Sequence, residues 1–261
     1  MSGEGGGTRI WYQSFVDPQQ QRPYINRLKK HLDLVAVSGA SYDVVGISPP
    51  DRYFHPITEF RIAGQVIRNA SEAEGQGYDA FVIGNFQEPG LNECKGALGI
   101  PVIGLGEAAM LHALTLGRKV GLITINPIFI PWHEDQISRY GLNQRVVGVR
   151  AMNTTVEDYM LAFEDDQAYE TVRNQFHEQA GPLLDLGVEV IIPAGGLPML
   201  LFSKEQDFTI DGATVLNGIT VAAKAAEMAV ELRKLDGTTV SRRAWFARAA
   251  PEAIEEFLQG H

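Results

Sequence analysis

The sequence has almost no cysteine, because Cys94 is the only one in a chain of 261 residues. A lone thiol excludes an internal disulfide bond, and it excludes any mechanism in which one chain supplies two thiols. A chain with so little cysteine is typical of a reducing compartment. We therefore expect a cytoplasmic protein that works without a thiol pair.

Long hydrophobic runs and positive charge are also scarce. No stretch of about 18 uncharged apolar residues occurs, so the sequence predicts no membrane-spanning helix. The 22 Lys and Arg residues are outnumbered by 32 Asp and Glu residues, which gives a net charge of −10. This charge repels the phosphates of nucleic acids and of anionic membranes. We expect neither nucleic acid nor a membrane as a partner.

The usual signatures of metal and cofactor sites are missing. The six histidines are scattered, without a His-Glu-x-x-His motif. His133-Glu134-Asp135 is the only cluster of a histidine with acids, and we interpret it as a solvated helix start. Residues 104–109 match a Gly-x-Gly-x-x-Ala dinucleotide pattern, but the strand that follows lacks the acidic ribose ligand. We predict no metal and no cofactor.

Short apolar strands alternate with amphipathic helical stretches along the chain. This alternation is typical of parallel βαβ units and predicts an α/β fold. The proline in the fourth strand indicates a peripheral position. The predicted strands cover residues 9–14, 42–46, 78–84, 100–104, 119–124, 145–150 and 188–192. The predicted helices cover residues 24–33, 57–76, 91–98, 131–140, 167–186 and 213–235.

The order of elements repeats, which predicts two similar parallel-sheet half-domains with a cleft between them. We place the first half-domain at residues 9–117 and the second at residues 118–212. The Ala-rich helix 213–235 is expected to pack back on the first half. Residues 236–261 are expected to form a helical tail that docks on its own domain or on a subunit partner.

Two strand ends share one plan. Residues 78–90 and 187–198 each contain an acidic residue, a β-branched run and a turn of small or polar residues. Ligands of parallel α/β sheets bind outside the carboxyl ends of the strands, so we expect these turns to converge on one site. The candidate binding residues at the strand ends are Gln13, Ser14, Asn85, Phe86, Thr124, Gly195 and Gly196.

Several segments resemble the hydantoin racemase branch of the aspartate/glutamate racemase superfamily. They are residues 84–91, 103–109 and 120–124, and the order of residues 140–142 and 187–192 also fits. The resemblance covers nearly all of the chain up to Leu235. It implies a cofactor-independent racemase, isomerase or decarboxylase of small carboxylates or cyclic imides. Members of this superfamily usually exchange the α-proton between two cysteines, one from each half.

In this resemblance the two cysteine positions fall on Asn85 and Gly195. Asparagine has no useful acid or base form, and glycine has no side chain, so neither residue carries a proton at neutral pH. We therefore expect the two-thiol mechanism to be absent. Cys94 does not replace it, because a cysteine inside a helix is more often part of the core.

The polar groups at these turns still suit an anion. The Asn85 amide, the Ser14 and Thr124 hydroxyls and the backbone N–H groups near Gly195 are donors for a carboxylate or an enolate. Three side chains are candidates for moving a proton: Glu88, Glu107 and His133. Their structural alternatives are that Glu88 caps the helix that begins near Gly90 and that Glu107 satisfies a helix N-terminus.

Two functions remain open from the sequence. The first is a cofactor-free isomerase, lyase, decarboxylase or hydrolase that acts on a small carboxylate or cyclic amide through a stabilised anion. The second is a regulatory protein that binds a small anion without turnover, which the pair Asn85 and Gly195 favours. We also expect a homo-oligomer, and Trp245 in the tail is a candidate for completing a site at a subunit interface.

Overall fold

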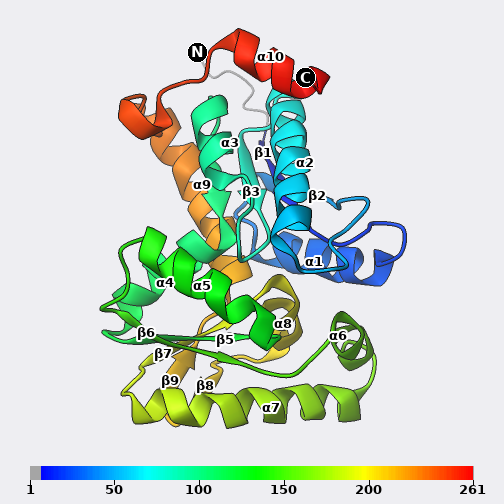
Figure 1. Cartoon of the computed structure of the whole chain (residues 1–261), viewed down its shortest axis with the longest axis vertical. Helices are drawn as coiled ribbons and strands as arrows, with labels where there is room; N and C mark the ends of the chain where they lie inside the picture. Colours follow the sequence, from blue (N-terminus) through cyan, green and yellow to red (C-terminus); the bar gives the residue numbers. More distant parts are fainter. Residues whose placement is uncertain (1–6, 261) are drawn as a thin grey trace. The chain divides into compact units, whose positions relative to one another are not determined.

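The computed structural model describes residues 7–260, which form two compact α/β units (Figure 1). The first unit contains the chain up to Gly104 together with the chain from Ala222 onward. The second unit contains Leu105–Val221. Each unit is built on its own sheet, so the α/β class predicted from the alternating pattern is confirmed.

The sheet of the first unit has four parallel strands in the order β2-β1-β3-β4. The fourth strand lies at an edge, as its proline predicted. In the register, Gln13 at the end of β1 is level with Val45 and Ile83 at the ends of its two neighbours. The carboxyl ends of these strands therefore form one edge. The strands are β1 (Thr8–Gln13), β2 (Ala40–Val45), β3 (Ala80–Ile83) and β4 (Val102–Gly104).

Helices cover both faces of this sheet. On one face Trp11 and Phe81 pack with buried residues of α2 and α3, around a T-shaped contact between Trp11 and Tyr78. On the other face, α9 hydrogen-bonds to Tyr42 of β2. The helices are α1 (Arg22–Val35), α2 (Pro56–Gly75), α3 (Leu91–Ala97) and α9 (Gly218–Asp236).

The second sheet has five strands in the order β6-β5-β7-β9-β8. All neighbours are parallel except β8 and β9, which form an antiparallel hairpin. Helix α7 lies along one face of this sheet (Figure 1). The strands are β5 (Val120–Thr124), β6 (Val146–Ala151), β7 (Val190–Ala194), β8 (Thr209–Ile210) and β9 (Ala213–Val215). The helices are α4 (Leu105–Leu116), α5 (Ile130–Arg139), α6 (Val156–Ala162), α7 (Asp166–Asp185) and α8 (Gly196–Leu201).

The structure corrects the start of the predicted helix at residues 213–235. Ala213–Val215 forms a strand, and the helix begins only at Gly218. The cause is a tight turn at Asp211-Gly212, where both residues have positive φ, of 49° and 85°. Asp-Gly is a favoured pair for such a two-residue hairpin turn. The turn joins β8 to β9, and β9 extends the sheet beside β7.

Helix α4 groups with the second unit, although the division at residues 117 and 118 assigned it to the first half. Its apolar residues pack on β5 and β7, because it enters the second unit directly after β4. Helix α6 lies between residues 150 and 167, where the sequence predicted neither a strand nor a helix. It begins with a capping box in which Thr155 and Asp158 exchange hydrogen bonds.

The C-terminal tail docks on its own unit. Arg242 donates hydrogen bonds to the backbone oxygens of Lys95 and Leu98 at the end of α3. Arg68 of α2 donates to the Phe257 carbonyl at 2.8 Å and stacks over the Phe257 ring. Helix α10 (Pro251–Gln259) is thereby fixed to α2, while Trp245 is 79% exposed. Among residues 7–260, no helix is long and apolar enough to cross a bilayer.

Helix α9 is held to the first sheet by a buried carboxylate. Glu227 accepts hydrogen bonds from the Tyr42 hydroxyl at 2.9 Å, from the Val37 N–H at 3.0 Å and from the Lys224 ammonium at 2.9 Å. Lys224 also donates to the Val35 carbonyl. These contacts join the helix to the end of α1 and to β2. Because buried charges need such partners, we expect the network to stabilise this docking.

Replacing Tyr42 with phenylalanine removes one donor and keeps the ring. We expect Tyr42→Phe to lower the free energy of unfolding by about 2 kcal/mol, because a buried carboxylate loses a hydrogen bond. Urea denaturation measures this change. Tyr53→Phe is the control, since Tyr53 is 76% exposed and its loss should be neutral. Equal stabilities of the two variants would show that the Tyr42 hydroxyl contributes nothing.

Candidate active site

Gln13 ends β1 and is completely buried. Its amide nitrogen donates to the carbonyls of Ser14 at 2.8 Å and Val45 at 3.1 Å. Its oxygen accepts from Asn69 at 2.7 Å and from the Trp11 indole at 3.2 Å. Both ends of this side chain are committed to the protein, so Gln13 shapes the strand end and has little left for a ligand.

Asn85 lies in the turn just after β3 and is half-buried. Its side-chain oxygen accepts a hydrogen bond from the Gln87 N–H at 2.8 Å. This bond to the backbone two residues on forms an Asx turn, which asparagine favours. The amide nitrogen of Asn85 has no partner among residues 7–260, and it is therefore free to donate. The next residue, Phe86, is buried, and Ser14 at the end of the neighbouring strand is also buried.

Glu88 combines burial with an uncommon backbone conformation. It is 3% exposed, and its φ of 59° lies in the left-handed region that non-glycine residues rarely adopt. Its carboxylate lies against Gly104 at the end of β4, so closely that a Cβ at residue 104 would be 2.0 Å from Oε1. Gly104 thus makes room for the acid. The helix that follows, α3, has Gly90 at its N-cap position, with φ 81°.

In the second unit, Thr124 ends β5 and is level with Ala194 at the end of β7. Both Thr124 and His133 of α5 are completely buried. His133 Nε2 lies 3.2 Å from Thr124 Oγ1, and His133 Nδ1 lies 3.4 Å from Gln136 Oε1. Burial lowers the pKa of His133 to about 4, so the ring is neutral at neutral pH.

The position of His133 contradicts its interpretation as part of a solvated helix start. Glu134 and Asp135 are exposed, but His133 points into the unit and stacks with Phe129, with ring centroids 6.4 Å apart. The three residues lie on one turn of a helix, and only one of them faces the core. Among residues 7–260, no group of three His, Cys, Asp or Glu side chains is arranged to hold a metal ion.

Gly195 follows β7 and is the N-cap residue of α8, which Gly196 begins. Its φ of 164° is extended backbone that any residue adopts. A Cβ at this position would lie 3.2 Å from Cδ of Pro198, a tight contact that a small movement of the ring relieves. Because Thr124 and Ala194 are register neighbours, Thr124 and Gly195 stand at adjacent strand ends.

The structure therefore gathers the predicted residues into two groups. Gln13, Ser14, Asn85, Phe86 and Glu88 lie at the carboxyl ends of β1 and β3. A second group, at the ends of β5 and β7, contains Thr124, His133, Gly195 and Gly196. Glu107 is half-buried in the first turn of α4. Cys94 is buried in the core of the first unit, as predicted, and burial raises the pKa of its thiol.

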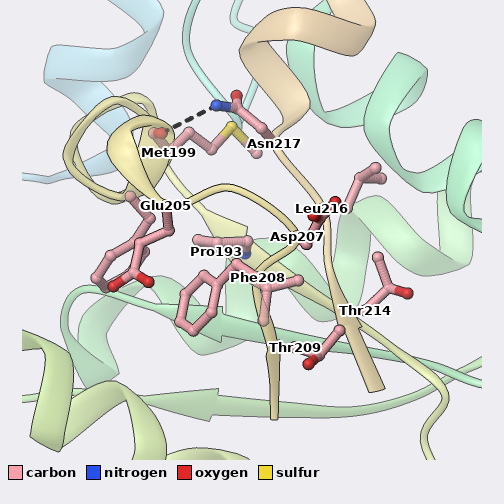
Figure 2. Close-up of a pocket in the computed structure, with 11 residues that line it drawn as sticks. Pro193, Met199, Glu205, Asp207, Phe208, Thr209, Thr214, Leu216 and Asn217 are labelled. Atoms are coloured by element: carbon pink, nitrogen blue, oxygen red, sulfur yellow. Dashed lines mark hydrogen bonds between the residues drawn. The ribbon is translucent and has the colours of Figure 1, made fainter. Parts of the chain in front are cut away.

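A cavity of about 320 Å³ opens elsewhere in the second unit, between α8 and the β8–β9 hairpin (Figure 2). None of the residues predicted from the sequence lines it. Asn217 donates a hydrogen bond to the Met199 carbonyl at 3.3 Å at one end of the cavity. Glu205 is held there by Arg173 at 2.7 Å and by the Tyr169 hydroxyl. The cavity was not predicted from the sequence, because its walls come from a hairpin that was not predicted either.

Comparisons with known proteins give the family. The Asp/Glu/Hydantoin racemase family matches residues 36–226. The chain is 34% identical over 156 residues to a hydantoin racemase of Rhizobium meliloti, in a match that spans 60% of this chain and only 62% of that protein. It is 26% identical over 212 residues to a hydantoin racemase of Pseudomonas sp. strain NS671, spanning 79% and 82% of the two chains.

Solved structures show the same fold. An allantoin racemase from Klebsiella pneumoniae superposes with a TM-score of 0.76 at 23% identity, covering 93% of this chain and 94% of the other. An allantoin racemase from Pseudomonas fluorescens gives a TM-score of 0.74 at 23% identity, covering 94% and 98%. The chain belongs to the Asp/Glu/hydantoin racemase family. Its family and its named relatives support an isomerase-like enzyme.

The burial of His133 predicts a pH-dependent stability. The unfolded imidazole takes up a proton near its ordinary pKa of 6.5, whereas the folded one does so only near 4. Protonation therefore favours the unfolded chain, and stability present above pH 6.5 is lost as the pH falls towards 4. A difference of this size corresponds to about 3 kcal/mol.

Urea denaturation between these two pH values should show that His133→Gln removes this part of the pH dependence. His112→Gln is the control, because His112 is exposed on α4 and its removal should leave the profile unchanged. An NMR titration of the native His133 ring tests the same point without a variant. A profile of His133→Gln that parallels the wild type, or a native ring that titrates near 6.5, would contradict the assignment.

Proposed function

We propose that this protein is a cofactor-independent enzyme that removes and returns the proton next to a carbonyl group of a small cyclic amide, without a thiol pair. The observation that carries the proposal is the buried carboxylate of Glu88, fixed beside the turn that holds Asn85. Hydantoin and allantoin racemases among the similar proteins support a cyclic amide as the substrate. A small carboxylate is the broader alternative.

The reaction needs a base, and Glu88 is the best placed candidate. Its carboxylate takes the proton from the carbon, the C–H electron pair moves into the enolate system, and the resulting carboxylic acid or water returns a proton. The contact with Gly104 restricts the position of the acid, which is how enzymes hold a base in a reactive geometry. Glu107, in the first turn of α4 in the second unit, is the other carboxylate that the sequence offers as a candidate acid.

The developing negative charge needs donors. The amide nitrogen of Asn85 supplies such a donor within the first unit. Preorganised donors of this kind stabilise an oxyanion without reorganisation during the reaction. In the second unit, the Nδ1–H of neutral His133 faces Gln136 Oε1, so Nε2 accepts the Thr124 hydroxyl hydrogen and His133 is a positioning residue for Thr124. Its imidazole is too weak a base at neutral pH to take the proton itself.

We infer that Asn85 and Gly195 stand where the superfamily resemblance puts the two cysteines. Neither residue exchanges protons, so in this proposal a carboxylate transfers the substrate proton. The same pair of residues also supports the other candidate function, a protein that binds a small cyclic amide or anion and does not turn it over. Assembly into a homo-oligomer and a cytoplasmic location are further proposals that accompany either function.

Proton exchange in heavy water tests the catalytic role of Glu88. Wild-type protein incubated with single enantiomers of methylhydantoin, allantoin and aspartate should exchange the α-proton of a cyclic amide above the protein-free rate, as followed by NMR and polarimetry. Glu88→Gln should slow exchange by about 10²-fold or more, because it removes the base and keeps the shape. Glu93→Gln is the matched control, since Glu93 is an exposed carboxylate five residues further on.

Loss of exchange in both variants would point to charge rather than to a base. If the wild type binds methylhydantoin in calorimetry but exchanges no proton of any compound, the binding protein replaces the enzyme as the assigned function.

Restoring thiols tests the assignment of the two cysteine positions. Each substitution fits locally, because Gly195 is extended and Asn85 lies in a half-buried turn. If positions 85 and 195 match the two cysteine positions of the superfamily, as the resemblance implies, we expect the double variant Asn85→Cys, Gly195→Cys to racemise methylhydantoin at least about tenfold faster than the wild type and either single variant. Iodoacetamide should abolish this gain.

The native thiol does not interfere with this measurement, because Cys94 is buried. A folded double variant with no gain over the single variants would show that positions 85 and 195 do not form a proton-exchanging pair.

A further inference from the structure

Tyr12 of β1 has a hydroxyl that the fold leaves unused. The residue is 1% exposed, and its Oη is buried without a hydrogen-bond partner among residues 7–260. Burying a hydroxyl without a hydrogen-bond partner is destabilising, and buried phenols usually find one. Tyr42 on the neighbouring strand shows the ordinary case, because its hydroxyl is bonded to Glu227.

The ring of Tyr12 runs along the sheet towards the carboxyl edge. Tyr12 is level with Val82 in the register of β1 and β3, yet its ring lies beside Gly84, two residues further on. A Cβ on Gly84 would come within 2.2 Å of Cε1 and 2.8 Å of Cζ of Tyr12. Only glycine leaves space for the ring here. The phenol oxygen is thereby carried to the residue that precedes Asn85.

The surroundings keep this hydroxyl protonated. Burial raises the pKa of Tyr12 far above its ordinary value, and the phenols of Tyr24 and Tyr42 raise it further. A neutral phenol is a hydrogen-bond donor that does not itself take a proton from a weak carbon acid. Its chemistry therefore suits a carbonyl oxygen on which negative charge develops.

We propose that Tyr12 donates a hydrogen bond through Oη to the substrate carbonyl oxygen at the Asn85 strand end. This rests on the proposed function and deepens it, because it selects compounds that have a carbonyl next to the reacting carbon. Tyr12 and Asn85 then supply two donors from one unit, and Glu88 supplies the base beside them. No covalent step is assigned to the phenol.

The decisive variant is Tyr12→Phe, which keeps the ring packing against Gly84. We expect it to lower kcat for proton exchange of methylhydantoin by about 10²-fold, as loss of one oxyanion donor does, with a much smaller change in KM. Thermal stability should be unchanged or higher, because an unpaired buried hydroxyl is removed. Tyr42→Phe is the matched control, with lower stability and unchanged exchange.

A direct readout follows the phenol itself. In protein labelled with carbon-13 at tyrosine Cζ, the resonance that disappears in Tyr12→Phe should shift when methylhydantoin is added to the wild type. Calorimetry should show that the wild type prefers methylhydantoin to methylimidazolidinone, which has the same ring without the carbonyl next to the methyl-bearing carbon. Tyr12→Phe should bind the two probes equally.

The outcomes separate this proposal from the proposed function. Suppose that the wild type shows no proton exchange, but that its tyrosine resonance shifts with ligand and that Tyr12→Phe loses the preference for the carbonyl compound. The donor role of Tyr12 is then supported, and the proposed enzymatic function is overturned. If exchange occurs but is unaffected by Tyr12→Phe and no resonance shifts, the donor role is overturned and the enzyme stands. A Tyr12→Phe protein that is less stable and equally active assigns the hydroxyl to the fold and also overturns the donor role.

Discussion

The parallel register of the central strands is the constraint on which the candidate residues of each unit depend. Parallel strands end at a common edge, where the backbone no longer has a sheet partner and the chain must turn. In the first unit, Gln13 and Ile83 are register neighbours at this edge, and in the second unit Thr124 and Ala194 are. Whatever residues follow those positions become neighbours, however far apart they are in the sequence.

Burial then decides what each polar group at these edges is able to do. Gln13 and Glu227 are buried and hydrogen-bonded to several other residues, so they stabilise the fold. His133 is buried with partners but neutral, so it orients a neighbour without carrying charge. Tyr12 is buried with its donor unused. The cost of burying a polar group is met in three different ways, by residues that stabilise the fold, by a residue that orients its neighbour, and by a residue with a donor left for a ligand.

The sequence was sufficient for the α/β class, the seven principal strands and the polar residues at their ends, because these depend on local apolar patterns. It failed where distant residues meet. Nothing near Glu88 in the sequence indicates that Gly104 makes room for its carboxylate. His133 was misjudged because its two acidic neighbours suggested solvent. The Asp211-Gly212 hairpin had a local signal, but the Ala-rich run after it gave a stronger helical pattern.

The close approach of Glu88 to Gly104 also limits how this protein evolves. A Cβ at residue 104 would lie 2.0 Å from Glu88 Oε1 and 2.9 Å from Leu91 Cδ2, so an alanine there displaces the Glu88 carboxylate from its present position. A shorter side chain at residue 88 removes the closer of these two contacts. Once a larger residue occupies position 104, a mutation back to glutamate at position 88 does not return the carboxylate to the place it has now. The order in which the two positions change thus determines whether the carboxylate is regained.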